Sequence, residues 1–190
     1  LGAFIPSFAI ADGTLYFGAY DDVSGTELWK TDGTPAGTVM VKDIQPGVNG
    51  NGVSDLVTMG STVFFSANDG TAGYELWTTD GTATGTVMVA EIAPGAASSG
   101  ISEMISVDGM LYFRATDGTT GAELWKSDGT TAGTELVKDI AVGAPSSSPN
   151  NLVAMGGDIY FIAAESTGQG NELWRTDGTE AGTVLVKDIN

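Results

Sequence analysis

Short apolar runs recur along the whole chain, and each is bounded by Gly, Asp, Asn or Pro. Between residues 55 and 92 four such runs follow one another, namely Asp55–Met59, Thr62–Ala67, Tyr74–Thr79 and Thr86–Ile92. Their length, their β-branched and aromatic side chains and their flanking turn residues predict strands. No stretch shows a sustained helical period of about 3.6 residues, so we expect no helix. The pattern therefore predicts an all-β protein of short antiparallel strands.

The four runs belong to an internal repeat. The segment Glu-Leu-Trp-x-[Thr/Ser]-Asp-Gly-Thr occurs four times, at Glu27–Thr34, Glu75–Thr82, Glu123–Thr130 and Glu172–Thr179. The steps between its tryptophans are 48, 48 and 49 residues. Four antiparallel strands in about 45–50 residues make one blade of a β-propeller. We predict a single repeat domain over residues 1–190, with four blades at about 1–46, 47–94, 95–142 and 143–190.

The third and fourth strands of the first unit can be aligned as a hairpin around the turn Asp32–Gly37. The alignment predicts four cross-strand pairs: Thr31 with Thr38, Trp29 with Met40, Leu28 with Val41, and Glu27 with Lys42. Each face of the sheet then carries apolar side chains, which fits a blade packed between two neighbours. The aspartate of Asp-Gly-Thr is expected to form the turn, because its side chain accepts backbone N–H groups. The motif positions interpreted as structural framework are Glu27, Trp29, Asp32, Glu75, Trp77, Asp80, Glu123, Trp125, Asp128, Glu172, Trp174 and Asp177.

Six of the seven basic residues fall at two positions of the repeat. One position follows the tryptophan and the other lies across from the glutamate: Lys30, Lys126 and Arg175, then Lys42, Lys138 and Lys187. We expect each lysine of the second set to form an ion pair with the glutamate of its own unit. The second unit has Thr78 and Ala90 instead. Glu75 is therefore expected to face Ala90 without a cation, at an interface or near a bound ion.

The motif continues into a tail, Gly-Thr-x-x-Val-Lys-Asp-Ile, at Gly37–Ile44, Gly133–Ile140 and Gly182–Ile189. Motif and tail together resemble the bacterial ELWxxDGT repeat family, and the resemblance covers the whole chain. It implies a propeller-like repeat fold and a secreted or cell-surface protein of a bacterium. It implies no particular reaction.

Charge and composition narrow the possible partners and chemistry. The chain carries 24 acidic and 7 basic residues, for a net charge of −17, which disfavours nucleic acid and anionic membranes. It contains no His and no Cys, so it lacks the usual catalytic triads, disulfides and zinc ligands. No apolar run approaches the ~20 residues of a membrane-spanning helix. Because the chain begins at Leu1, we expect a processed product or a fragment.

Carboxylates are the only conventional acid–base groups that remain, and no pair of them is distinguished by its position. We therefore expect no enzyme. Calcium is the one cofactor that suits hard oxygen ligands in Gly-rich acidic loops. Its candidate ligands are Asp21, Asp22, Asp69 and Asp117. The alternative is that these residues belong to ordinary acidic turns.

Aromatic side chains are candidates for binding a glycan. The tryptophans and the Tyr-Phe pairs lie on predicted strands with apolar partners, so we assign them to the core. Tyr20 and Tyr74 flank loops and are the better surface candidates. A ligand-binding module, such as an adhesin or a lectin that uses calcium, is accordingly the alternative function.

The ends of the chain leave two arrangements open. The last blade meets the first in the same molecule and closes a four-bladed ring, or it meets the first blade of another molecule. In the second case the uncharged N-terminal segment, with Leu1, Phe4, Ile5, Phe8 and Ile10, is expected to mediate self-association. The function expected first is a non-catalytic extracellular structural protein that associates head to tail into a filament, a surface layer or a matrix.

Overall fold

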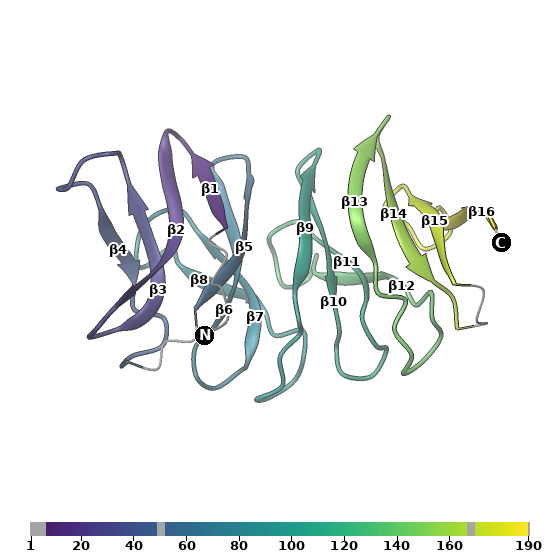
Figure 1. Cartoon of the computed structure of the whole chain (residues 1–190), viewed down its shortest axis with the longest axis horizontal. Coiled ribbons are helices and arrows are strands. Elements are labelled where there is room, and N and C mark those ends of the chain that lie inside the picture. The colour runs from purple at the N-terminus through teal and green to yellow at the C-terminus, as the bar shows by residue number, and fades with distance from the viewer. Residues whose placement is uncertain (1–6, 49–51, 167–169, 190) are drawn as a thin grey trace.

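The computed structural model describes residues 7–48, 52–166 and 170–189. They form four separate four-stranded antiparallel sheets, and no helix occurs among them (Figure 1). Within each sheet the strands are hydrogen-bonded in the order in which they follow along the chain. The predicted all-β, propeller-like architecture of four blades with four strands each is confirmed.

The strand bounds repeat from blade to blade. The first blade contains β1 (Phe8–Ala11), β2 (Thr14–Asp21), β3 (Gly25–Thr31) and β4 (Val39–Lys42). The second contains β5 (Val53–Met59), β6 (Thr62–Asn68), β7 (Tyr74–Thr79) and β8 (Val87–Ala90). The third contains β9 (Ser102–Val107), β10 (Met110–Ala115), β11 (Glu123–Ser127) and β12 (Glu135–Lys138). The fourth contains β13 (Asn150–Met155), β14 (Asp158–Ala164), β15 (Asn171–Thr176) and β16 (Val184–Lys187).

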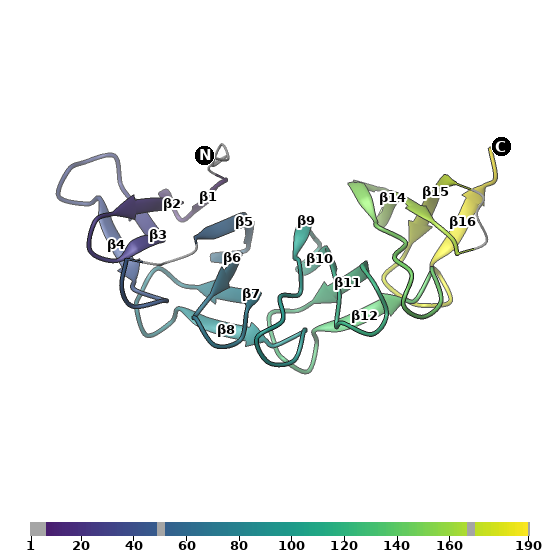
Figure 2. The same cartoon turned by 60° about the horizontal axis from the view of Figure 1, so that its bottom comes forward.

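The blades follow one another along an open arc (Figure 2). Strands β1, β5 and β9 lie toward its concave side, and β8 and β12 toward its convex side. The first strand of each blade contacts the first strand of the next. The first and fourth blades lie at opposite ends of the arc (Figures 1 and 2). Of the two arrangements left open by the sequence, the ring closed within one chain is therefore not the one observed.

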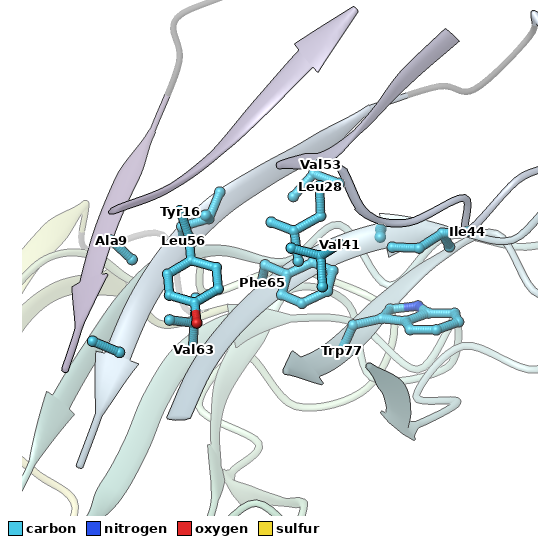
Figure 3. Packing of buried hydrophobic residues seen from close by; sticks show 12 residues of the cluster. Ala9, Tyr16, Leu28, Val41, Ile44, Val53, Leu56, Val63, Phe65 and Trp77 are labelled. Carbon is cyan, nitrogen blue, oxygen red and sulfur yellow. The ribbon is translucent and has the colours of Figure 1, made fainter. Parts of the chain in front are cut away.

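The apolar core lies between blades. Three clusters of buried side chains fill the three blade interfaces, each joining one face of a blade to the opposite face of the next. In the first cluster Leu28 of the first blade packs with Phe65 and Trp77 of the second (Figure 3). Because both faces of an inner blade are covered, both carry apolar residues, as the strand pattern predicts.

The predicted register of β3 and β4 is right at its turn end and wrong at the other. Trp29 lies opposite Met40 as expected. Leu28, however, lies opposite Lys42, because the register shifts between Leu28 and Trp29 and Val41 falls in the bulge. The same shift occurs in the other three blades. A one-residue bulge changes which side chains are neighbours beyond it, so the predicted Glu27–Lys42 pair does not form.

Candidate functional site

The four motif glutamates are buried and bind backbone amides. In the first blade the Glu27 carboxylate accepts the N–H of Ile44 at 2.9 Å and that of Gln45 at 3.1 Å. Glu75, Glu123 and Glu172 repeat the first bond, to Ile92, Ile140 and Ile189. Burial raises the pKa of Glu27, Glu75 and Glu123, although these hydrogen bonds act to lower it. The glutamate therefore ends the fourth strand by binding the connector that leads to the next blade.

The expected ion pairs of these glutamates are wrong, and so is the expected position of Glu75 opposite Ala90. Lys42 and Lys138 form no ion pair with Glu27 and Glu123 within the described residues, and Lys187 lies opposite Leu173 in the ladder. The bulge displaces the lysines from the glutamates, and the connector amides take their place.

Glu75 is also not exceptional. It lies opposite Ala67, while Ala90 lies opposite Leu76. Its carboxylate has the same kind of amide partners as the other motif glutamates, Ile92 and Ala93. No ion pair to Glu75 occurs among the described residues, but an interface or a bound ion is not needed to explain it.

The lysines instead join neighbouring blades. Lys42 Nζ donates to the carbonyl of Thr86 in the second blade at 2.7 Å and lies 5.8 Å from the centroid of the Trp77 ring. Lys138 Nζ donates to Thr183 of the fourth blade at 2.8 Å and lies 6.0 Å from the Trp174 ring.

The lysines that follow the tryptophan act in the same way. Lys30 Nζ donates to the Gly81 carbonyl at 2.7 Å, and Lys126 Nζ to the Gly178 carbonyl at 2.8 Å. Sequence reasoning missed this role of the lysines in joining blades. The signal that could have indicated it is that the second unit lacks the lysines at both positions. The lysines of the first and third units thus belong to two interfaces, between blades one and two and between blades three and four.

The Asp-Gly-Thr triplet forms the turn as expected. Asp32 Oδ1 accepts both the N–H and the hydroxyl of Thr34, and Asp80, Asp128 and Asp177 do the same with their own threonines. These hydrogen bonds lower the pKa of the four aspartates. Gly37 lies so close to the Asp32 carboxylate that a Cβ there would overlap it. The turn therefore needs glycine at this position for space.

The calcium candidates lie in corresponding loops of the first three blades. Asp21 accepts the N–H groups of Val23 and Ser24, and Asp69 and Asp117 accept N–H groups two and three residues ahead. These are turn bonds of the kind that the alternative interpretation requires. Asp22 is exposed. Within the described residues no three acidic side chains cluster as metal ligands would. The turn bonds explain the positions of Asp21, Asp69 and Asp117 without a metal ion. Calcium binding therefore stays a prediction.

The aromatic candidates separate into core and surface. Trp77, Trp125 and Trp174 are buried between blades, and Trp29 is half-buried on the outer face of the first blade. Tyr20 is 63% exposed, whereas Tyr74 is half-buried. Tyr20 is thus the more accessible of the two predicted glycan contacts, and glycan binding stays a prediction.

At each end of the arc, one blade face is not covered by any other described blade. The outer face of the first blade, called the head face, carries Phe8, Ile10, Phe17, Trp29 and Met40. The outer face of the fourth blade, called the tail face, carries Val153, Met155 and Leu173, and by their places in the repeat also Val186 and Ile189.

The tail face repeats positions that are buried in the other blades. Val186 is 46% exposed, and its counterpart Val41 in the first blade is 7% exposed. Ile189 is 71% exposed, and its counterpart Ile44 is 7% exposed. Sequence reasoning did not single out Val186 or Ile189, although their repeat positions identify them once the arc is known to be open. The tail face is therefore a blade-packing surface that no described blade covers.

The head face carries exposed apolar side chains that could pack against the tail face. Phe8 and Ile10 are 57% and 65% exposed, and the rings of Phe8 and Phe17 lie 6.4 Å apart. Phe8–Ala11 forms the edge strand β1 and is paired with β2 of its own blade. The other predicted association residues, Leu1, Phe4 and Ile5, lie outside the described residues.

No protein-family model matches the chain, and no curated protein matches its sequence. Among solved structures, a puromycin hydrolase superposes with a TM-score of 0.61 and 16% identity, over 97% of this chain and 29% of its own. A prolyl endopeptidase gives 0.59 and 13%, over 95% and 26%. TolB from Acinetobacter baumannii gives 0.53 and 10%, over 94% and 42%. These neighbours are β-propeller proteins, and this chain spans less than half of each.

Identities this low show a shared fold alone. The likeness supports the propeller-like arrangement of the four blades. The described part of the chain contains no apolar helix of membrane-spanning length.

Proposed function

We propose that this chain is a non-catalytic structural repeat protein that associates head to tail, with the tail face of one copy packed on the head face of the next. The observation that carries the proposal is the exposure of Val186 and Ile189 at positions that are buried in the preceding blades. A second copy would cover them with the same kind of blade face that covers Val41 and Ile44.

The chemistry of the two faces supports this partner. Each of the three described blade interfaces joins a face with Leu, Val and Ile to a face with Phe and Trp. The tail face offers the first kind of surface and the head face the second. Such a contact is heterologous, and it produces a ring if the rotation closes and a filament if it does not. The resemblance to the ELWxxDGT repeat family supports a location outside the bacterial cell, in a surface layer or a matrix.

The test is to block each face separately. Phe8→Asp introduces a charge on the head face and Val186→Asp on the tail face, while Val142→Asp is the matched control at a site 72% exposed in a connector. Analytical ultracentrifugation over a concentration series should show assembly of the unmodified chain and of the control. Each face variant alone should remain monomeric.

Mixing the two face variants gives the sharper result. One variant keeps an intact tail face and the other an intact head face, so the mixture should form heterodimers and nothing larger. Electron microscopy of the unmodified chain then separates a closed ring from a filament or layer. A monodisperse monomer at high protein concentration, with and without calcium, would refute the proposal.

A further inference from the structure

The interface between the second and third blades contains a cavity of about 390 Å³. Its lining includes Ala90 and Glu91 from the second blade and Asp117, Trp125 and Thr134 from the third. This is the interface that lacks both lysines, since Thr78 and Ala90 occupy their positions. A different side chain connects these two blades, because the Thr131 hydroxyl donates to the Val89 carbonyl at 2.6 Å.

The neighbouring interfaces show what normally occupies this place. At the first interface the Lys42 ammonium lies over the Trp77 ring and donates to the Thr86 carbonyl. At the third, Lys138 does the same with Trp174 and Thr183. Ala90, Trp125 and Thr134 hold the corresponding positions at the second interface, by their places in the repeat.

Where the other units have lysine, the second unit has Ala90, which lacks the four-carbon stem and the ammonium group. The residues that would contact this lysine are still present. An aromatic ring face attracts a cation within about 6 Å of its centroid. The backbone carbonyl accepts an ammonium hydrogen at two equivalent positions in this same protein. The cavity therefore keeps the ring and the carbonyl position that hold lysine at the two neighbouring interfaces.

The charges around the cavity favour a cation further. Two carboxylates, Glu91 and Asp117, line it, and no basic residue is among the described residues of its lining. The units that carry the lysine have Asp43, Asp139 and Asp188 where the second unit has Glu91, so this unit has the longer acidic side chain. A charge of this sign beside an aromatic face selects an organic cation over an anion or a neutral sugar.

We propose that the cavity between the second and third blades binds a primary alkylammonium group, with its stem along Ala90 and Trp125 and its head at the Thr134 carbonyl. The group belongs either to a free alkylamine or to a lysine side chain of a partner polypeptide, and the two sources share this chemistry. A hard metal ion fits less well, because no group of three acidic side chains among the described residues is placed to hold one. The indole N–H of Trp125 is buried without a hydrogen-bond partner among the described residues, but the other three tryptophans share this feature. The ring face, and not the N–H group, therefore distinguishes the site.

The four indole N–H resonances provide a direct readout, because the chain contains four tryptophans. They can be assigned by single Trp→Phe variants. Titration with n-butylammonium should shift the Trp125 resonance with saturation at millimolar concentrations. Trp77 and Trp174, whose rings are already covered by Lys42 and Lys138, should not respond.

The control ligands show whether binding needs the charge or only the apolar stem. They also show whether the site accepts a free amine or a lysine side chain. n-Butanol has the same stem without the charge and should bind at least tenfold more weakly. Nα-acetyl-lysine methylamide presents the same group from a peptide, and its Nε-acetylated form should not bind. Binding of the free amine alone points to a small molecule, and binding of the peptide form as well points to a polypeptide partner.

Matched variants test the site from inside. Ala90→Lys supplies the missing ammonium and should abolish binding, and Ala90→Met fills the space without charge and should also abolish it. Lys42→Ala should create a second site, seen as a new response of Trp77. Melting curves verify that each variant is folded. The proposal is overturned if n-butylammonium causes no shift of Trp125, if butanol binds equally well, or if a folded Ala90→Lys protein still binds.

Discussion

Lys42 of the first blade lies over the ring of Trp77 in the second, with its ammonium nitrogen 5.8 Å from the ring centroid. The same ammonium donates to the Thr86 carbonyl at 2.7 Å. One side chain thus connects two blades by a cation–π contact and a charged hydrogen bond. Since the apolar core lies between blades, such contacts add to the stability of the blade interfaces.

Removal of this contact should destabilise the chain measurably. A cation–π contact contributes roughly 0.5–2 kcal/mol and a hydrogen bond to a charged group roughly 1.5–3 kcal/mol, and the two are not additive. We expect Lys42→Ala to lower the free energy of unfolding by about 1–3 kcal/mol in urea denaturation. Lys187→Ala is the matched control, because Lys187 holds the same repeat position as Lys42 but is exposed, and it should change stability by less than about 0.5 kcal/mol. Equal effects of the two substitutions would contradict the inter-blade role.

Replacement of a buried motif glutamate by alanine should destabilise the chain more than replacement of an exposed glutamate. Glu123 is fully buried and accepts the N–H groups of Ile140, Ala141 and Ser147. Glu123→Ala leaves these donors without their acceptor, and each unsatisfied buried group costs roughly 1–3 kcal/mol. We expect a loss of about 2–5 kcal/mol, measured by thermal or urea unfolding.

The control for this substitution is Glu135→Ala. The Glu135 side chain is 59% exposed and lies 3.1 Å from the Lys126 ammonium. A surface ion pair contributes about 0–1 kcal/mol, so the control should lose no more than that. If the two alanine variants are equally stable, the amide-binding role of the motif glutamate is wrong.

The pH dependence of stability should have a maximum in mildly acidic solution. Burial raises the folded-state pKa of Glu27, Glu75 and Glu123 above the ordinary 4.5. Above that value the folded state binds more protons than the unfolded state, so stability falls as pH rises through the folded pKa. The turn aspartates have a pKa below the ordinary 3.8, so their contribution is present above 3.8 and is lost as pH falls through their folded pKa.

Melting temperatures over an acidic to neutral pH series would check this. The decline between mildly acidic and neutral pH should be shallower in Glu123→Gln, because one titrating carboxyl group has been removed. A melting temperature that rises steadily from pH 4 to pH 7, in the unmodified chain and the variant alike, is the opposite of the expected result.

The turn glycine can be tested by a double-mutant cycle. A Cβ at Gly133 would overlap the Asp128 carboxylate, so Gly133→Ala should destabilise the chain by about 1–3 kcal/mol through overpacking. Asp128→Ala removes the obstructing carboxylate and also its turn bonds to Thr130. The double variant should therefore be more stable than the sum of the single effects predicts. Strict additivity in urea unfolding would show that the two residues do not interact.

Strand positions were predictable because their signals are local. Tyr74–Thr79 is predicted and observed with the same bounds, since apolar alternation and the Asp-Gly-Thr turn define both of its ends. The run ending at Ile92 is observed only to Ala90, because the Glu75 carboxylate takes the N–H of Ile92 and of Ala93. That partner is seventeen residues away, beyond the reach of a strand pattern.

The sequence alone determined the number of units, their four-stranded form, the turns and the two apolar faces of each blade, because each follows from residues close together in the chain. Tertiary structure decided the rest. The bulge at Leu28 separates Lys42 from Glu27, and blade stacking brings Lys42 to Trp77 instead. The rotation from one blade to the next leaves the arc open and Ile189 exposed. Such rotations arise from side-chain packing across whole sheets, which no local pattern records.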